Sequence, residues 1–380
     1  SLLSGGIVRF VSGVRKLNAE RYGFIFGRFD YHFGSELIPD DCRTLKLFHM
    51  LRNLKYFAGV VALCAAFGTG CSGAVSEETP VKVIFDTDMG NDIDDALALD
   101  MLYKYADEGR ITLLGITSNK EEHPASVEYI DILNTFYGYP DIPVGRIREG
   151  ANCDRENSFV AQTSRDGDYK RTISDYDALP ESAELLRRLL ASQGDGEVTL
   201  IAVGFSTNLQ RLMASGPDAV SSLDGMELIR RKVKHLYMMA GEFEQAEGKS
   251  AEYNIRIDRN AAQELFEKWP TPVTVSPFEV GSRILYPVES ILGDFGYVEK
   301  HPLAEAYKVY KPMPYDRPMW DPSAVLCAVE PDAGYFRYSA PGRIRVDDES
   351  MTWFEPDPAG RHRYLIAGEA ECARARERMV

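Results

Sequence analysis

The chain has 380 residues, of which 44% are hydrophobic and 27% charged. This composition is typical of a folded globular protein and excludes a disordered chain, a collagen-like repeat and a polytopic membrane protein. The net charge is −15, and residues 1–70 hold nine basic and five acidic side chains, so the rest of the chain carries −19. Such an acidic body repels phosphate backbones and excludes nucleic acid as a partner. The six cysteines include no CxxC pair, so neither a disulfide framework nor a zinc site is expected.

Residues 50–71 have the layout of a secretory signal. Met50 is followed by the basic residues Arg52 and Lys55, by an apolar run over 56–67, and by a Gly-Cys pair that ends at Cys71. The apolar run is too short to span a bilayer comfortably. The Gly-Cys ending resembles a bacterial lipoprotein lipobox, although a Gly stands where that motif has Leu three residues before the cysteine. A plain cleaved signal or a buried helix is the alternative.

This layout divides the chain into four parts. We expect an unfolded upstream extension over 1–49, a lipoprotein signal peptide over 50–71, a polar tether over 72–80 and one folded domain over 81–380. Cys71 is then the acylated first residue of the mature protein. The expected location is the bacterial cell envelope, in the periplasm or at the outer membrane, with a lipid anchor as the only attachment to a membrane.

Strand-like and helical segments alternate from residue 81 onward. Short apolar runs predict strands over 81–85, 111–117, 198–203, 233–239 and 273–276. Helical spacing predicts helices over 96–105, 124–137, 181–193 and 259–268. This alternation predicts an α/β fold, with a mostly parallel central sheet and helices on both faces. The segments 343–346, 351–354 and 362–366 predict a small antiparallel C-terminal appendage, and the polar stretch 146–176 predicts a lid or binding loop.

Five carboxylates follow the first predicted strand within ten residues: Asp86, Asp88, Asp92, Asp94 and Asp95. They repel each other strongly unless a cation neutralises them. Open α/β sheets bind their ligands at the carboxyl ends of the strands, and carboxylate oxygens suit calcium or magnesium. A helix N-cap is the alternative role, but one Asp would suffice for it.

Two other kinds of acidic loop can be compared with this segment. An EF-hand needs a Glu at its twelfth position, which is Leu97 when counted from Asp86. A phosphatase of the haloacid dehalogenase type begins with a strand and a DxD pair, which residues 86–88 match. That pattern does not account for the acidic residues that follow, so a magnesium-dependent phosphatase is the less favoured alternative.

The whole segment 86–96, DTDMGNDIDDA, resembles the DxDxGxDDA signature of the inosine–uridine-preferring nucleoside hydrolase family, with two additional residues after the glycine. The resemblance covers about 81–330 and recurs in order at ITSN (116–119), DIPVG (141–145), AVGFSTNL (202–209), AEYNI (251–255) and WDPSAV (320–325). Each of these short matches is weak evidence alone, but their occurrence in the same order as in the family is strong evidence for the resemblance. The resemblance implies a calcium-dependent hydrolase that releases ribose and free base from ribonucleosides, in purine or pyrimidine salvage. A homo-oligomer is a further expectation from the family.

The resemblance also implies roles for individual residues. The positions of the calcium ligands are those of Asp88, Asp95, Asp321 and the backbone carbonyl of Val203. Asp88 is in addition the expected general base for the attacking water. The ribose-binding positions are those of Asp94, Asn119, Glu252 and Asn254. Asp86 is expected to support the loop, and the additional Asp92 can replace Asp94 in its role.

The chain departs from the family at the leaving group. Family members of broad specificity carry a His beside the last calcium ligand, where this chain has Trp320. An indole cannot donate that proton, but its face can bind a purine by stacking and help it leave. An ordinary buried aromatic is the alternative, so the base and even the class of leaving group stay open. A nucleoside-binding lipoprotein without turnover is therefore the main alternative function.

Overall fold

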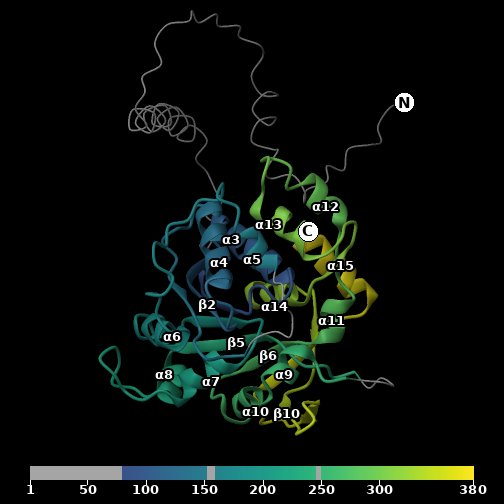
Figure 1. Ribbon diagram of the computed structural model, residues 1–380. Coiled ribbons are helices and arrows are strands. Elements are labelled where there is room, and N and C mark those ends of the chain that lie inside the picture. The colour runs from purple at the N-terminus through teal and green to yellow at the C-terminus, as the bar shows by residue number, and fades with distance from the viewer. Residues whose placement is uncertain (1–78, 152–158, 245–249) are drawn as a thin grey trace, which may run out of the picture. The chain divides into compact units, whose positions relative to one another are not determined.

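A central sheet organises the described part of the chain, which comprises residues 79–151, 159–244 and 250–380 of a computed structural model (Figure 1). In spatial order its strands are β11 (Thr352–Pro356), β10 (Gly342–Val346), β12 (His362–Ile366), β6 (Val273–Ser276), β5 (Val233–Met239), β4 (Val198–Ala202), β1 (Val81–Thr87), β2 (Ile111–Ser118) and β3 (Val144–Gly145). All pairings from β12 to β3 are parallel. The predicted α/β fold is confirmed. The expected extension and signal peptide, with Cys71, lie outside the described residues.

Helices cover both faces of the sheet (Figure 1). One hydrophobic core joins the sheet to α3 (Asp94–Asp107), α4 (Ala125–Tyr137), α13 (Pro302–Tyr310), α14 (Trp320–Val329) and α15 (Glu369–Met379). A second core joins it to α6 (Ser182–Ala191), α7 (Thr207–Ala214), α8 (Gly225–Lys232) and α10 (Arg259–Lys268). The strands serve both cores because side chains alternate along them: Val83 and Phe85 belong to the first core and Ile84 to the second.

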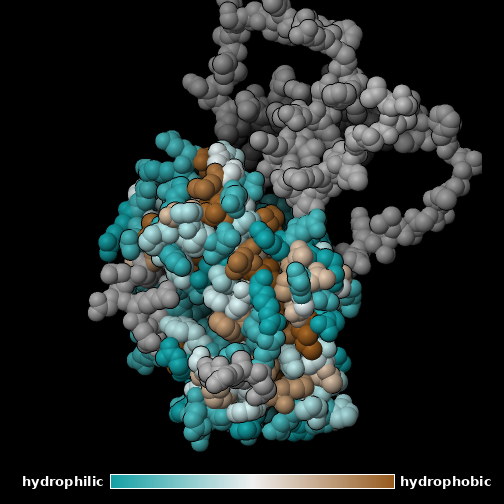
Figure 2. All heavy atoms as spheres, turned by 90° about the vertical axis from the view of Figure 1, so that its right-hand side faces the viewer, coloured by the Kyte–Doolittle hydropathy of each residue, from teal (hydrophilic) through white to brown (hydrophobic). Residues whose placement is uncertain are grey.

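Short elements complete the fold near the ends of the strands. They are the helices α5 (Phe159–Thr163), α9 (Tyr253–Ile257), α11 (Phe278–Ser282) and α12 (Val288–Gly293), the strand β9 (Arg337–Tyr338), and the antiparallel pair β7 (Leu285–Tyr286) and β8 (Arg317–Pro318). The face that carries α11, α12 and α15 is mostly hydrophilic, with apolar side chains in small separate patches (Figure 2). Within the described residues, none of the helices combines the length and the apolar character needed to cross a membrane.

The predicted C-terminal antiparallel strands are present, and they extend the main sheet. β10 pairs with β11 and β12 in antiparallel fashion, while β12 lies parallel to β6 and so joins the hairpin to the sheet. The ring of His362 helps to connect these strands, because its Nδ1 accepts a hydrogen bond from the backbone N–H of Ile344 at 2.9 Å. This bond requires an unprotonated Nδ1.

Stability should therefore fall when His362 is protonated. Burial lowers the pKa of His362 to about 4 in the folded chain, whereas an unfolded His titrates near 6.5. Between these values the unfolded chain binds more protons, so stability is lost as the pH falls from about 6.5 to 4. We expect His362→Asn, which keeps an acceptor but cannot be charged, to reduce this loss by on the order of 2 kcal/mol. Urea unfolding of parent and variant at pH 7 and pH 4.5 measures it, and an identical loss in both would contradict the prediction.

Part of the predicted lid is a fixed segment against α4. The buried Asp131 of α4 accepts hydrogen bonds from the backbone N–H of Thr172 (3.1 Å) and of Ile173 (3.0 Å) and from the hydroxyl of Tyr176 (2.8 Å). These bonds satisfy the buried carboxylate and hold residues 172–176 in place. None of the described residues of 146–176 lines the pocket at the acidic loop.

Candidate active site

The acidic loop between β1 and α3 opens into a pocket of about 200 Å³ near the carboxyl ends of β4 and β5. The pocket is lined by Asp88, Asn91, Asp92, Asp94, Val203, Met239, Glu252, Tyr253, Asn254, Phe278, Tyr310, Arg317, Trp320 and Asp321. Most of the site residues expected from the sequence are in this set, although they come from segments more than 200 residues apart. The parallel topology brings them together, because parallel strands end at the same edge of the sheet.

The loop depends on a glycine at its turn. Gly90 has a φ of +116°, which side chains rarely allow, and a Cβ there would lie 2.9 Å from Val160 Cγ2 and 3.2 Å from Lys120 Nζ. The loop then leads directly into α3, whose first turn contains Asp94 and Asp95. Carboxylates are favourable there because the N-terminus of a helix carries a partial positive charge.

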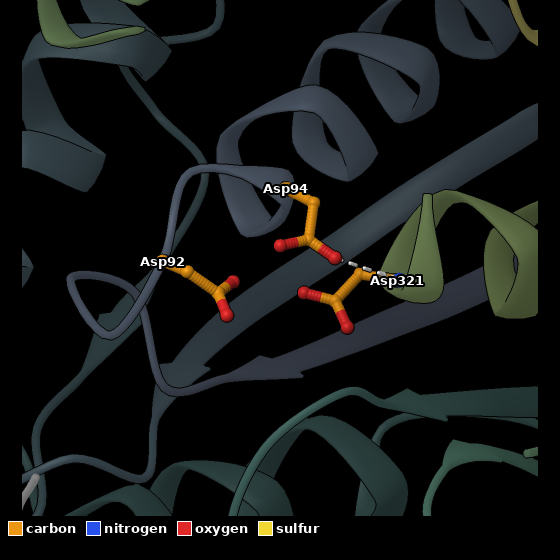
Figure 3. A group of neighbouring side chains, drawn as sticks. All are labelled: Asp92, Asp94 and Asp321. Carbon is orange, nitrogen blue, oxygen red and sulfur yellow. Dashed lines mark hydrogen bonds between the residues drawn. The ribbon is translucent and has the colours of Figure 1, made fainter. Parts of the chain in front are cut away.

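Three carboxylates from two distant segments point toward one another (Figure 3). Asp92 lies in the loop, Asp94 in the first turn of α3 and Asp321 in the first turn of α14, and one oxygen of each lies within 4.8 Å of the others. Oδ2 of Asp94 accepts a hydrogen bond from the backbone N–H of Asp321 at 3.3 Å. Burial raises the pKa of Asp94 and of Asp321; neighbouring carboxylates raise the pKa of both further, while the charge of Arg317 opposes the rise at Asp94.

Asp88 and Asp95 belong to the same buried cluster. Burial and the charge of Asp92 raise the pKa of Asp88 to about 7, and burial and the charge of Asp88 raise the pKa of Asp95. Oδ1 of Asp95 accepts a hydrogen bond from the hydroxyl of Thr87, whereas its buried Oδ2 has no hydrogen-bond partner. A buried carboxylate oxygen without a donor is costly, and a hard cation would stabilise it. The residues present therefore fit calcium.

Asp86 is buried at the end of β1, and its hydrogen bonds connect β1 to the end of β2 and to α7. It accepts hydrogen bonds from Thr117 Oγ1 (2.5 Å), Asn119 Nδ2 (2.7 Å) and Asn208 Nδ2 (2.7 Å). Burial raises the pKa of Asp86 to about 6, although these three donors favour its charged form. The other end of the Asn119 amide accepts the N–H of Phe205 at 3.0 Å. Asn119 is not among the residues that line the pocket, and both ends of its amide are bonded within the protein, so its ribose contact stays a prediction from the resemblance.

The end of β4 and the start of α9 form another side of the pocket. Nδ2 of Asn254 donates a hydrogen bond to the carbonyl of Val203 at 3.3 Å. Gly204 follows, where a Cβ would lie only 2.6 Å from Asp88 Cβ, so a glycine is needed for this close approach. Glu252 caps α9 by accepting from the N–H groups of Asn254 (2.9 Å) and Ile255 (3.2 Å). These contacts hold Glu252 and Asn254 at the pocket wall.

Trp320 lies in an aromatic wall of the pocket, and its indole is already engaged. Its Nε1 donates hydrogen bonds to the carbonyl of Phe278 and to Ser282 Oγ, both at 3.0 Å. The Phe278 ring stacks on it with centroids 5.3 Å apart, and the guanidinium of Arg317 lies over it at 4.8 Å. Phe278 is 40% exposed, so it offers more accessible apolar surface than most residues of the pocket.

Arg317 lines the pocket and was not among the residues expected from the sequence. Its side chain is buried, and it forms ion pairs of 2.6 Å with both Asp92 and Asp94. Burial alone would lower the pKa of Arg317, but the charges of these two carboxylates outweigh it and raise the pKa. A single Arg three residues before Trp320 carries no motif. Only the proximity of the acidic loop could have indicated its role, and that proximity arises in the folded chain.

A buried carboxylate cluster at the carboxyl ends of a parallel sheet, with polar side chains and aromatic rings around one small pocket, defines an α/β enzyme for a small polar ligand. The model of the inosine-uridine preferring nucleoside hydrolase family matches residues 83–364. The chain therefore belongs to this family of N-glycosyl hydrolases.

Solved structures show the same fold. A plant nucleoside hydrolase, PpNRh1, is 22% identical with a TM-score of 0.60, over 79% of this chain and 99% of that one. The purine-preferring ribonucleoside hydrolase from Gardnerella vaginalis is 18% identical (TM-score 0.58, 78% and 98% covered). The inosine-uridine preferring nucleoside hydrolase from Bacillus anthracis is 16% identical (TM-score 0.57, 79% and 100% covered). Comparison with curated protein sequences gave no match.

Proposed function

We propose that this protein hydrolyses the N-glycosidic bond of ribonucleosides, in a calcium-dependent reaction that releases ribose and a free base. The observation that carries the proposal is the buried carboxylate cluster with the unpartnered Oδ2 of Asp95, in a chain of this family. Asp88, Asp95, Asp321 and the carbonyl of Val203 would hold the calcium ion. When bound, calcium would supply a Lewis acid that binds and orients a water molecule and the ribose diol.

Asp88 is the proposed general base. It lines the pocket, and Asn91 donates a hydrogen bond to its Oδ2, which fixes the orientation of the carboxylate. In this proposal the Asp88 carboxylate accepts the proton of the attacking water. Because a carboxylate is needed for this step, the protonated form of Asp88 is inactive.

Glu252 and Asn254 position the sugar. Glu252 lines the pocket, and backbone N–H groups of Gly241, Asn254 and Ile255 hold its carboxylate in place for a contact with a ribose hydroxyl. Asn254 lies beside it on the pocket wall. Binding energy from the hydroxyls then holds the anomeric carbon near the attacking water, which lowers the entropic part of the barrier.

In this proposal the nucleobase of the substrate lies against the aromatic wall. Phe278 and Trp320 provide apolar surface there, and no histidine is among the described residues that line the pocket. The departing base is therefore stabilised by stacking and by exclusion of water rather than by a histidine acid.

A panel of ribonucleosides tests the function. Reducing sugar should appear from at least one of inosine, uridine, adenosine or guanosine with added calcium, and should disappear with a chelator. Calorimetric binding of a nucleoside without ribose release would favour the binding-protein alternative. Turnover of p-nitrophenyl phosphate without ribose release would favour the phosphatase.

We further propose that acylated Cys71 anchors the protein at the bacterial cell envelope. Several acyl chains, at about 0.8 kcal/mol per buried CH₂, suffice for firm attachment. The full-length protein expressed in bacteria should partition into detergent, and Cys71→Ala should move it to the aqueous phase. Equal partitioning of both forms would refute the anchor.

A further inference from the structure

We infer that Arg317 is a built-in counter-cation that removes Asp92 and Asp94 from the metal-binding set and leaves Asp88, Asp95 and Asp321 to hold the ion. This inference rests on the proposed calcium site and names a residue that sets its affinity. The acidic loop is thereby divided into two parts with different partners. One part faces a cation of the protein itself, and the other faces the cation taken from solution.

Both oxygens of Asp94 are engaged within the protein. Oδ1 accepts hydrogen bonds from Arg317 Nη2 at 2.6 Å and from Arg317 Nε at 3.1 Å, and Oδ2 accepts the N–H of Asp321 at 3.3 Å. Asp92 shares the same guanidinium, with its Oδ2 2.6 Å from Arg317 Nη2. Asp95 contrasts with both, because its buried Oδ2 has no partner. The oxygen that needs a cation is thus on Asp95 rather than on Asp94.

Arg317 is fixed where it stands. Its Nη1 donates to Tyr310 Oη at 3.1 Å, and the guanidinium lies 5.1 Å from the Tyr310 ring centroid and 4.8 Å from that of Trp320. The residue is only 7% exposed. A buried guanidinium without carboxylates would be strongly unfavourable, so Arg317 and the two Asp residues depend on each other.

A second cation lies near the loop, where it pairs with Glu122 and also favours the charged form of Asp88. Lys120 is 2% exposed and forms an ion pair with Glu122, beneath the turn at Gly90. Arg317 is therefore the cation that balances Asp92 and Asp94. Asp92 belongs to the stretch that makes this loop two residues longer than the family signature, and it shares the guanidinium of Arg317 with Asp94.

The proximity of Asp92, Asp94 and Asp321 allows a different assignment. Their oxygens lie within 4.8 Å of one another, and this distance would also suit ligands of one ion. If they were the ligands, Arg317 would have to leave Asp92 and Asp94 whenever the ion binds. The two assignments predict opposite orders for the effects of substitutions at Asp95 and at Asp92, so they can be separated by binding measurements.

Calcium titration calorimetry on Arg317→Met is the first measurement, with Arg345→Met of the exposed β10 as the matched control. Removal of the guanidinium leaves the cluster more negative and frees two carboxylates, and affinity at oxygen sites follows the charge of the ligands. We expect calcium to bind about tenfold more tightly or better, with no change in the control. Unchanged or weaker binding by a folded Arg317→Met would overturn the inference, and circular dichroism checks the fold.

Two further variants keep the test decisive if Arg317→Met does not fold. Asp95→Asn should weaken calcium binding by about a hundredfold, whereas Asp92→Asn should weaken it by no more than about tenfold, because only Asp95 is a direct ligand and Asp92 acts through its charge alone. The reverse order would overturn the inference and assign the ion to Asp92, Asp94 and Asp321. Absence of calcium binding in the parent and in every variant would overturn it as well. The expected order of affinities without ribose release would instead refute the proposed hydrolase and leave the inference standing.

Discussion

Asp88→Asn should lower the turnover of a ribonucleoside at least about 10³-fold, because loss of a general base alone costs about 10²–10⁴. The substitution keeps the size of the side chain and removes charge from a buried cluster in which burial and Asp92 already raise the pKa of Asp88. Stability should be retained, since less negative charge remains among neighbouring carboxylates. Steady-state release of reducing sugar and a thermal melt measure the two effects.

The control for this substitution is Asp141→Asn. Asp141 is exposed and precedes β3 at the amino end of the sheet, so it loses the same charge far from the pocket. Its activity should equal that of the parent. Turnover by Asp88→Asn within tenfold of the parent would refute its assignment as the base.

Trp320→Ala should cost about 5–150-fold in kcat/KM for a nucleoside, because stacking of a base on an aromatic side chain contributes about 1–3 kcal/mol. The structure gives a second reason to expect a loss of activity, in addition to the loss of direct stacking. Phe278 stacks on the indole and Trp320 Nε1 bonds to the Phe278 carbonyl, so loss of Trp320 also displaces the most exposed ring of the wall. Kinetics on inosine measure the loss.

A second substrate separates stacking from a structural role. p-Nitrophenyl riboside is this substrate, and its p-nitrophenolate leaving group departs without protonation. Its hydrolysis should therefore be reduced less by Trp320→Ala than the hydrolysis of inosine. If Trp320 is only structural, both substrates should lose equally and the melting temperature should fall. Trp353→Ala on β11 is the matched control and should leave both activities unchanged.

Trp320→His tests the same position by introducing the acid that the family resemblance implies for members of broad specificity. Unchanged inosine hydrolysis in both Trp320→Ala and Trp320→His would show that the nucleobase binds elsewhere.

Long periodic segments were predicted well because their burial pattern is local. The strands 233–239 and 273–276 and the helix 259–268 have the predicted bounds. α14 was missed for a physical reason: nine of its ten residues are buried, so it has no polar face and its sequence shows no helical period. The short helices near the pocket were missed because they span one or two turns.

The sequence by itself determined the fold class and the chemistry of the acidic loop, since strand and helix periods and a cluster of carboxylates are properties of neighbouring residues. It also placed Asp321, Glu252 and Asn254 at the pocket through the order of the family phrases. Only the tertiary structure decided how the carboxylates share their partners. Arg317 lies more than 220 residues from the loop whose acids it pairs with, and the two ends of the Asn119 amide are bonded to Asp86 and to Phe205. Such partners are set by the distance between atoms in the folded chain, which the spacing of residues along the sequence does not contain.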